Sequence, residues 1–157
     1  MKSILITGIG GDFAQSCARV VMNMDEDIRI LGCDIDVSNN GGLFCENVFK
    51  VPKADEDDYI SELESLINLH NIDLVLVCTE HEMLKLSASK SSNELILKKQ
   101  LGYFKSSWRI GYDKLETMRW LSKHDLNTLH YELFCNNITS KARVILKRGD
   151  RLILKPR

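Results

Sequence analysis

The chain opens with a short apolar run, followed at once by a glycine-rich turn and then by a helical pattern. Residues 3–7 (SILIT) are mostly apolar and rich in isoleucine, as expected of a strand buried on both faces of a parallel sheet. After the turn GIGGD at residues 8–12, apolar residues recur every three or four positions, which predicts a helix packed on that sheet. The apolar stripe consists of Phe13, Ala14, Cys17, Val20, Val21 and Met24.

The same alternation of strand and helix continues along the first two thirds of the chain. Further strands are predicted at residues 28–34, 47–51 and 73–79, and helices at residues 57–70, from residue 80 onward and at 92–101. Because such alternation implies right-handed crossovers, the predicted fold class is α/β. We expect a Rossmann-like parallel sheet with helices on both of its faces.

Composition fits an ordinary globular protein that builds a core of its own. The 157 residues are 44% hydrophobic and 27% charged, and no apolar run approaches the roughly 20 residues that span a bilayer. The opening residues are predicted to form a strand rather than a signal peptide, so a cytoplasmic location is expected. The five cysteines are scattered without a CxxC pair, which indicates neither a disulfide framework nor a zinc site.

Charge divides the chain into two halves. Residues 1–97 carry 7 Lys and Arg against 17 Asp and Glu, whereas residues 98–157 carry 14 against 5. Halves of opposite charge indicate two structural units, and the basic half is suited to attracting phosphate groups. The alternative is a pair of solvated faces that attract each other.

Functional loops of a parallel sheet lie at the carboxyl ends of its strands. In this chain those ends are residues 8–12 (GIGGD), 33–36 (CDID) and 78–82 (CTEHE). Glu80 and Glu82 suit the first turn of a helix, and with His81 they do not form a recognisable set of metal ligands. No metal site is therefore expected there.

A glycine-rich first turn raises the alternative of a dinucleotide site. Gly8 and Gly10 fit the GxGxxG fingerprint, but Phe13 takes the third glycine position, where its bulk would hold helix and strand apart. A carboxylate of Asp12 at the helix N-cap would also repel a phosphate. Asp34 or Asp36 still suits the ribose contact of an NAD site. A further alternative is a tight turn that needs glycine only for its backbone angles.

The basic half predicts one clear helix. Asp113 followed three residues later by Glu116 is typical of a capping box, and the helix is expected to end near His124. Its inward face is predicted to contain Leu115, Met118, Leu121 and Ser122. Residues 128–134 alternate between polar and apolar, and residues 151–155 (RLILK) predict a strand after a Gly149–Asp150 turn.

Several segments together resemble ATP-grasp ligases, and in particular carbamoyl-phosphate-synthase large-subunit-like proteins. They are ILITGIGGDFAQSCARV, ILGCDID, ENVFKVPKADEDDYISELESLINLHNIDLVLVCTEHEMLKLS, IGYDKLETMRWLSKHDLNT and RLILKPR, in the family's order. The resemblance covers essentially the whole chain. It implies a pre-ATP-grasp domain at residues 1–109, followed at residues 110–157 by a linker helix and the truncated beginning of the ATP-grasp N-terminal subdomain.

The resemblance also implies roles for individual residues. Lys114, in the DK helix start, and Lys155, in the LKP strand, match family lysines that contact the phosphates of ATP. The acceptor-substrate side would be formed by Gly8, Gly10, Gly11, Asp12, Thr79 and Glu80. Catalytic residues stay unassigned. Two departures from the family pattern are Cys78, where relatives often have proline, and the missing proline after the DK helix.

The ending RLILKPR reads as a strand with no cap after it. In the family, a glycine-rich loop and the ligands of two magnesium ions follow this strand, so ATP and Mg²⁺ are implied for a complete protein. That protein would join a carboxylate to an amine through an acyl-phosphate, with a homodimer or a complementing C-terminal half as partner. The 157 residues alone are expected to have no ligase activity, and detectable turnover would contradict this.

Two functions from other classes remain open in the sequence. The first is an NAD-binding domain of an oxidoreductase. The second is a non-catalytic interaction module, in which the RLILK strand recruits a partner chain by edge addition. Nucleic-acid binding is not expected, because few aromatic residues are interleaved with the basic ones.

Overall fold

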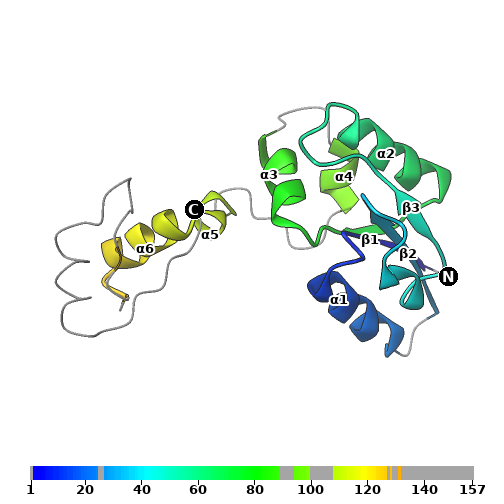
Figure 1. The fold of residues 1–157 in the computed structure, drawn as a ribbon, viewed down its shortest axis with the longest axis horizontal. Coiled ribbons are helices and arrows are strands. Elements are labelled where there is room, and N and C mark those ends of the chain that lie inside the picture. The colour runs from blue at the N-terminus through cyan, green and yellow to red at the C-terminus, as the bar shows by residue number, and fades with distance from the viewer. Residues whose placement is uncertain are drawn as a thin grey trace. The chain divides into compact units, whose positions relative to one another are not determined.

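The computed structural model of the protein describes residues 2–24, 27–88, 94–99, 108–126, 128 and 131. The chain divides into two compact units, Met1–Lys105 and Ser106–Arg157, and each is described by itself. Figure 1 shows the course of the chain through both.

The described strands of the first unit form one parallel, four-stranded sheet (Figure 1). They are β1 (Lys2–Thr7), β2 (Ile28–Asp34), β3 (Val48–Lys50) and β4 (Leu74–Leu76), in the spatial order β3-β2-β1-β4. In register, Ile4 lies opposite Ile30 on one side and Leu74 on the other. Because all strands run in the same direction, the loops that follow β1, β2 and β4 gather at one edge of the sheet.

Helices cover both faces of this sheet, as predicted (Figure 1). They are α1 (Asp12–Met22), α2 (Tyr59–Leu69), α3 (Glu80–Ala88) and α4 (Glu94–Lys99), with a short 3-10 helix, η1 (Asn40–Leu43), after β2. Alternate strand residues point to opposite faces. Leu5 and Val75 pack with α2, α3 and α4 on one face, while Ile4 and Ile6 pack with α1 on the other.

The inward face of α1 differs from the predicted stripe. Ala14, Ala18 and Val21 are buried against the sheet, whereas Phe13 and Val20 are 64% and 67% exposed, and Met24 is exposed as well. Small alanine side chains allow the helix backbone to approach the sheet closely. The apolar residues of this segment occupy more than half of the helix circumference, so periodicity alone did not identify the buried side.

The described part of the second unit consists mainly of α5 (Trp108–Tyr112) and α6 (Lys114–Lys123). The sequence predicted α6 but not α5. No residue of α6 is buried: Leu115, Met118 and Leu121 are half-buried, and Ser122 is exposed, so its assignment to the inward face was wrong. Most of residues 128–134 and all of the predicted strand at 151–155 lie outside the described residues. Among the helices described, none combines the length and apolar character needed to cross a membrane.

Candidate functional site

The loop after β1 is held by hydrogen bonds to its own backbone and to the end of β2. The N–H of Ile9 donates to the carbonyl of Cys33 at 3.2 Å, and the N–H of Gly11 donates to the carbonyl of Gly8 at 2.9 Å. The N–H of Gly10 donates to the Asp34 carboxylate at 2.8 Å. All three amide groups that could face a ligand here already have partners within the protein.

Glycine is required at two positions of this loop for different reasons. Gly8 has φ of 59°, in the left-handed region, and a Cβ on it would overlap the methyl group of Thr79. A Cβ on Gly10 would lie 2.7 Å from the side-chain carbon of Asn39. The loop therefore needs glycine for backbone angle at Gly8 and for close approach at both positions.

These contacts count against a dinucleotide site, although one argument from the sequence was wrong. Phe13 does not hold helix and strand apart, because its side chain is largely exposed. Instead, Asp34 uses one carboxylate oxygen for the N–H of Gly10 and the other for the N–H of Asp36 at 3.2 Å. An acid in this position would normally bind the ribose of NAD. Here it fixes the loop.

Asp36 and Asp12 have environments that the sequence did not predict. The hydroxyl and backbone N–H of Ser38 donate to Asp36, which lowers the pKa of that exposed carboxyl. The N-cap of α1 is Gly11 and not Asp12, which is the first residue of the helix. No side chain among the described residues caps this end, so the prediction of a capping carboxylate from Asp12 was wrong.

A buried carboxylate joins the ends of β1 and β4. One oxygen of Glu82 accepts hydrogen bonds from the hydroxyl of Thr7 at 2.6 Å and from the hydroxyl of Thr79 at 2.7 Å. Thr7 in turn accepts the N–H of Cys78 at 3.1 Å. Thr79 also accepts the N–H of Glu82 at 3.2 Å, as an N-cap of α3 does. The network fixes the loop after β4 next to the loop after β1.

Burial dominates the electrostatics of this network. Desolvation raises the pKa of Glu82, with a further increase from the charge of Asp34, although the two threonine hydroxyls oppose the shift. Burial also raises the pKa of Tyr59, and nearby Glu82 raises it further. The fully buried Tyr59 hydroxyl has no hydrogen bond of normal geometry within the described part of the chain. Burial is the largest of these influences, so the net shift of the Glu82 pKa is upward.

The sequence predicted that the loop at residues 78–82 is functional. It did not predict the hydrogen bond between Thr7 and Glu82 at the centre of the network. The T-x-x-E spacing of Thr79 and Glu82 could have indicated their contact, since this spacing is typical of a capping box. Glu80, in contrast, is exposed at the first position of α3. No three His, Cys, Asp or Glu side chains in the described ranges are grouped so that they could hold a metal ion.

An open depression lies beside the carboxyl ends of β2 and β3. Its volume is about 600 Å³, and it is lined by Ile35, Asp36, Lys50, Val51, Pro52, Lys53, Glu56, Asp58 and Glu62. Apart from the loop at residues 33–36, the sequence did not single out this surface. Its lining combines two lysines with four carboxylates.

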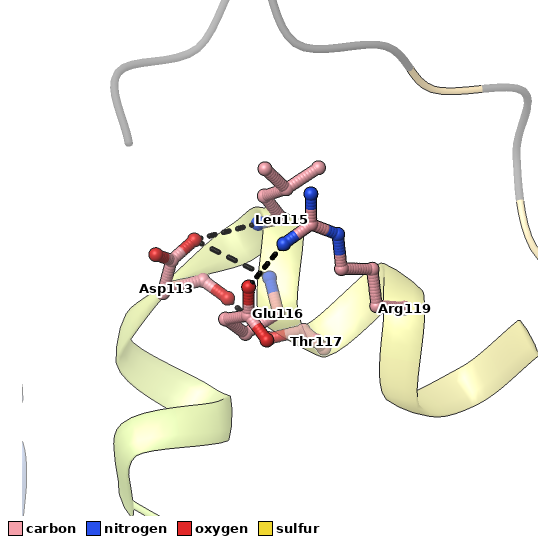
Figure 2. A network of polar contacts seen from close by, with 5 residues as sticks. All are labelled: Asp113, Leu115, Glu116, Thr117 and Arg119. Carbon is pink, nitrogen blue, oxygen red and sulfur yellow. Dashed lines mark hydrogen bonds and ion pairs between the residues drawn. The ribbon is translucent and has the colours of Figure 1, made fainter. Parts of the chain in front are cut away.

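In the second unit, Asp113 caps α6 as predicted (Figure 2). The Asp113 carboxylate accepts the N–H of Leu115 at 2.9 Å and that of Glu116 at 3.3 Å. Glu116 pairs with Arg119 at 2.6 Å, one turn further along. Because Asp113 already satisfies these amide groups, an anion bound here would depend on side-chain cations.

Of the two lysines predicted to contact the phosphates of ATP, the structure describes only Lys114. Lys114 is exposed at the first position of α6, where its charge is opposed by the positive end of the helix dipole. A lysine in this place costs stability rather than adding to it. Lys155 lies outside the described residues. The convergence of these two cations on one triphosphate stays a prediction.

The fold of this chain is similar to that of several solved structures. No protein-family model and no curated protein matches the chain. Among solved structures, N5-carboxyaminoimidazole ribonucleotide synthetase from Thermotoga maritima is 19% identical, with a TM-score of 0.58, over 92% of this chain and 36% of that one. N5-carboxyaminoimidazole synthetase from Staphylococcus aureus is 14% identical, with a TM-score of 0.62, over 92% and 35%.

A third neighbour has a different named activity. L-amino acid ligase from Bacillus licheniformis is 13% identical, with a TM-score of 0.50, over 83% of this chain and 36% of that one. These neighbours are ligases of the ATP-grasp family, matched in their N-terminal part. The chain has this pre-ATP-grasp fold. It spans about a third of the length of each of these ligases.

Proposed function

We propose that this chain is the N-terminal portion of an ATP-grasp ligase that joins a carboxylate to an amine through an acyl-phosphate. The observation that carries the proposal is the fold match to two synthetases over 92% of the chain, with TM-scores of 0.58 and 0.62. A third neighbour is named as an amino acid ligase, which fits the same class of reaction. The narrower resemblance to carbamoyl-phosphate-synthase-like proteins stays a prediction.

The acceptor substrate is assigned to the carboxyl edge of the first unit. Gly8 and Thr79 are in close approach there, and Asp12 begins a helix whose N-terminus has no side-chain cap among the described residues. The proposal places the acceptor beside Gly8, Gly11 and Thr79, with the carboxylates of Asp12 and Glu80 close by.

ATP is assigned to the second unit through Lys114. Its ammonium group is exposed and could reach a phosphate, and it would have to supply the attraction itself because Asp113 already accepts the N–H groups of Leu115 and Glu116. Lys155 is proposed as the second phosphate contact. Bound Mg²⁺ would neutralise phosphate charge in the complete ligase. The described residues offer no grouped metal ligands, so no metal contact is assigned to this chain.

Nucleotide binding by the full 157-residue chain tests this assignment. A charged hydrogen bond to phosphate contributes about 1.5–3 kcal/mol, so Lys114→Ala should weaken ATP binding by about 10- to 100-fold. Binding is measured by ligand-observed NMR titration. Lys123→Ala is the matched control, because it removes an exposed lysine from the opposite end of the same helix.

Two outcomes would contradict the proposal. The first is equal ATP affinity for Lys114→Ala, Lys123→Ala and the unmodified chain. The second is preferential binding of NADH that is lost in Asp34→Asn, which would favour the oxidoreductase alternative. The hydrogen bonds that already occupy Asp34 and Gly10 predict that NADH does not bind.

A further inference from the structure

One side of α1 carries apolar side chains that the sheet does not cover. Phe13, Val20 and Met24 are exposed, and Cys17 between them is half-buried. Their spacing of four, three and four residues places them in one row along the helix. Exposed apolar residues are usually scattered singly, whereas a contiguous row indicates a contact surface. These four residues are called the apolar flank below.

The apolar flank faces β4. On the other side of the helix, the guanidinium of Arg19 lies 4.9 Å from the ring centre of Phe44, which precedes β3 in the chain. That contact puts β2 and β3 on the Arg19 side, and β4 neighbours β1 on the opposite side. Leu74 and Leu76 of β4 are only half-buried on this face. The partly uncovered apolar surface therefore continues from the helix onto β4.

The described helices leave this surface without a neighbour. α2, α3 and α4 pack on the opposite face of the sheet, whereas α1 packs on its own face (Figure 1). Within the described ranges, no second α-helix lies beside α1 over β4. A homodimer was one of the partners predicted for a complete protein, without an assigned surface.

We propose that the apolar flank binds the same flank of a second copy of this chain, with the two α1 helices antiparallel. In a two-fold pair of this kind, both copies contribute the same residues to the contact. A two-fold axis between Gln15 and Ser16 places Phe13 of each copy between Cys17 and Val20 of the other. A large side chain then packs into the space between two smaller ones, as a knob packs into a hole.

Charge favours a second copy as the partner. Asp12 and Arg19 are seven residues apart, which is two helical turns, so they lie in a row of their own beside the apolar flank. Both side chains are exposed. With the same two-fold axis, Asp12 of each copy lies opposite Arg19 of the other, and two ion pairs form. A parallel pair would instead set like charges against each other.

The contact is small, so a weak dimer is expected. α1 has 11 residues and is about 16 Å long, and one pair of such helices buries less area than a standard interface. We expect a dissociation constant of about 10–100 μM. Dimer formation does not depend on the proposed ligase function.

Sedimentation velocity of the full chain at rising concentration tests the proposal. The unmodified protein should show a monomer–dimer equilibrium. Val20→Glu sets a carboxylate into both halves of the apolar contact and should raise the dissociation constant by about 10-fold or more. Met22→Glu is the matched control, because Met22 is an exposed apolar residue on the opposite side of the same helix, and it should leave the equilibrium unchanged.

A charge exchange tests the antiparallel arrangement. Arg19→Asp sets carboxylates against each other at two places and should weaken the dimer by about 2- to 30-fold. Asp12→Arg combined with Arg19→Asp forms both ion pairs again and should restore the affinity. Alkylation of the unmodified chain gives a readout that needs no variant. Reaction at Cys17 should slow as protein concentration rises, while reaction at Cys45 should not change.

Three results would overturn the proposal. A monomer up to about 500 μM, far above the expected dissociation constant, would exclude a second copy as the partner. A dimer that persists in Val20→Glu would use another surface. A dimer that Arg19→Asp weakens and the double exchange does not restore would contradict the antiparallel arrangement. ATP binding by Lys114→Ala is measured separately, and neither result decides the other.

Discussion

The helices of the two units are stabilised in different ways. In the first unit, α2 buries Tyr59, Leu63 and Ile67 almost completely against the sheet. In the second, α6 has no buried residue, and its polar contacts include the capping bonds of Asp113 and the Glu116–Arg119 pair. Apolar burial stabilises α2, whereas hydrogen bonds at its N-terminus stabilise α6. Equivalent substitutions in the two units should therefore lower the free energy of unfolding by unequal amounts.

The largest effect is expected in the core of the first unit. Leu63→Ala removes a side chain that is 0% exposed, and such changes lower the free energy of unfolding by about 2–5 kcal/mol. Leu69→Ala is the matched control on the same helix, since Leu69 is 75% exposed, and it should cost no more than about 0.5 kcal/mol. Urea denaturation followed by circular dichroism measures both. Equal costs would contradict the burial described for α2.

A smaller effect is expected at Glu82, where a polar group is buried in the first unit. Glu82→Ala leaves the hydroxyls of Thr7 and Thr79 without their acceptor, at a cost of about 1–3 kcal/mol. Glu82→Gln retains an acceptor and should cost less. Thermal and urea denaturation across pH 4–8 compare these variants with Glu80→Gln, which changes an exposed carboxylate.

The stability of the Glu82 and Glu80 variants should depend on pH in different ways. Burial raises the pKa of Glu82 above the ordinary value of 4.5, so the folded state keeps a proton that the unfolded state releases. The free energy of unfolding should therefore decrease as the pH rises above 4.5, until Glu82 ionises in the folded protein. Glu82→Gln should remove this slope and Glu80→Gln should retain it. Parallel profiles for Glu82→Gln and the unmodified protein would contradict the assignment.

The smallest effect is expected at the start of α6. Asp113→Ala removes the carboxylate that accepts two backbone N–H groups, at a cost of about 1 kcal/mol. Asp113→Asn retains a capping oxygen and is the control. Hydrogen exchange should increase in the first turn of α6 only. Faster exchange in β1 or β2 would show that the two units are coupled more strongly than local capping implies.

The sequence predicted the sheet and its helices because their signals are local. Residues 3–7 and 28–34 are mostly apolar, and the helix predicted at 57–70 contains Tyr59, Ile60, Leu63 and Ile67, which are all buried in α2. The inward face of α1 was not predictable in the same way. Phe13 and Val20 are as apolar as Val21, and only the contact with the sheet shows which of them is covered.

The candidate site was predicted only in part, because its main contacts join residues that are far apart in the sequence. The carboxyl ends of parallel strands gather at one edge of a sheet, so the loops at residues 8–12 and 78–82 were expected at the same edge. The hydrogen bond from Thr7 to Glu82 joins residues 75 positions apart, and the bond from Gly10 to Asp34 joins residues 24 apart. Contacts of this range depend on tertiary packing and leave no periodic pattern.

The close approach of Gly8 to the Thr79 methyl restricts which sequences can share this site. A residue with a side chain at position 8 would need both a left-handed backbone and free volume that Thr79 now occupies. Related chains should therefore vary at the two positions together, with a larger group at one accompanied by a smaller group at the other. This covariation can be looked for among homologues without any knowledge of the substrate.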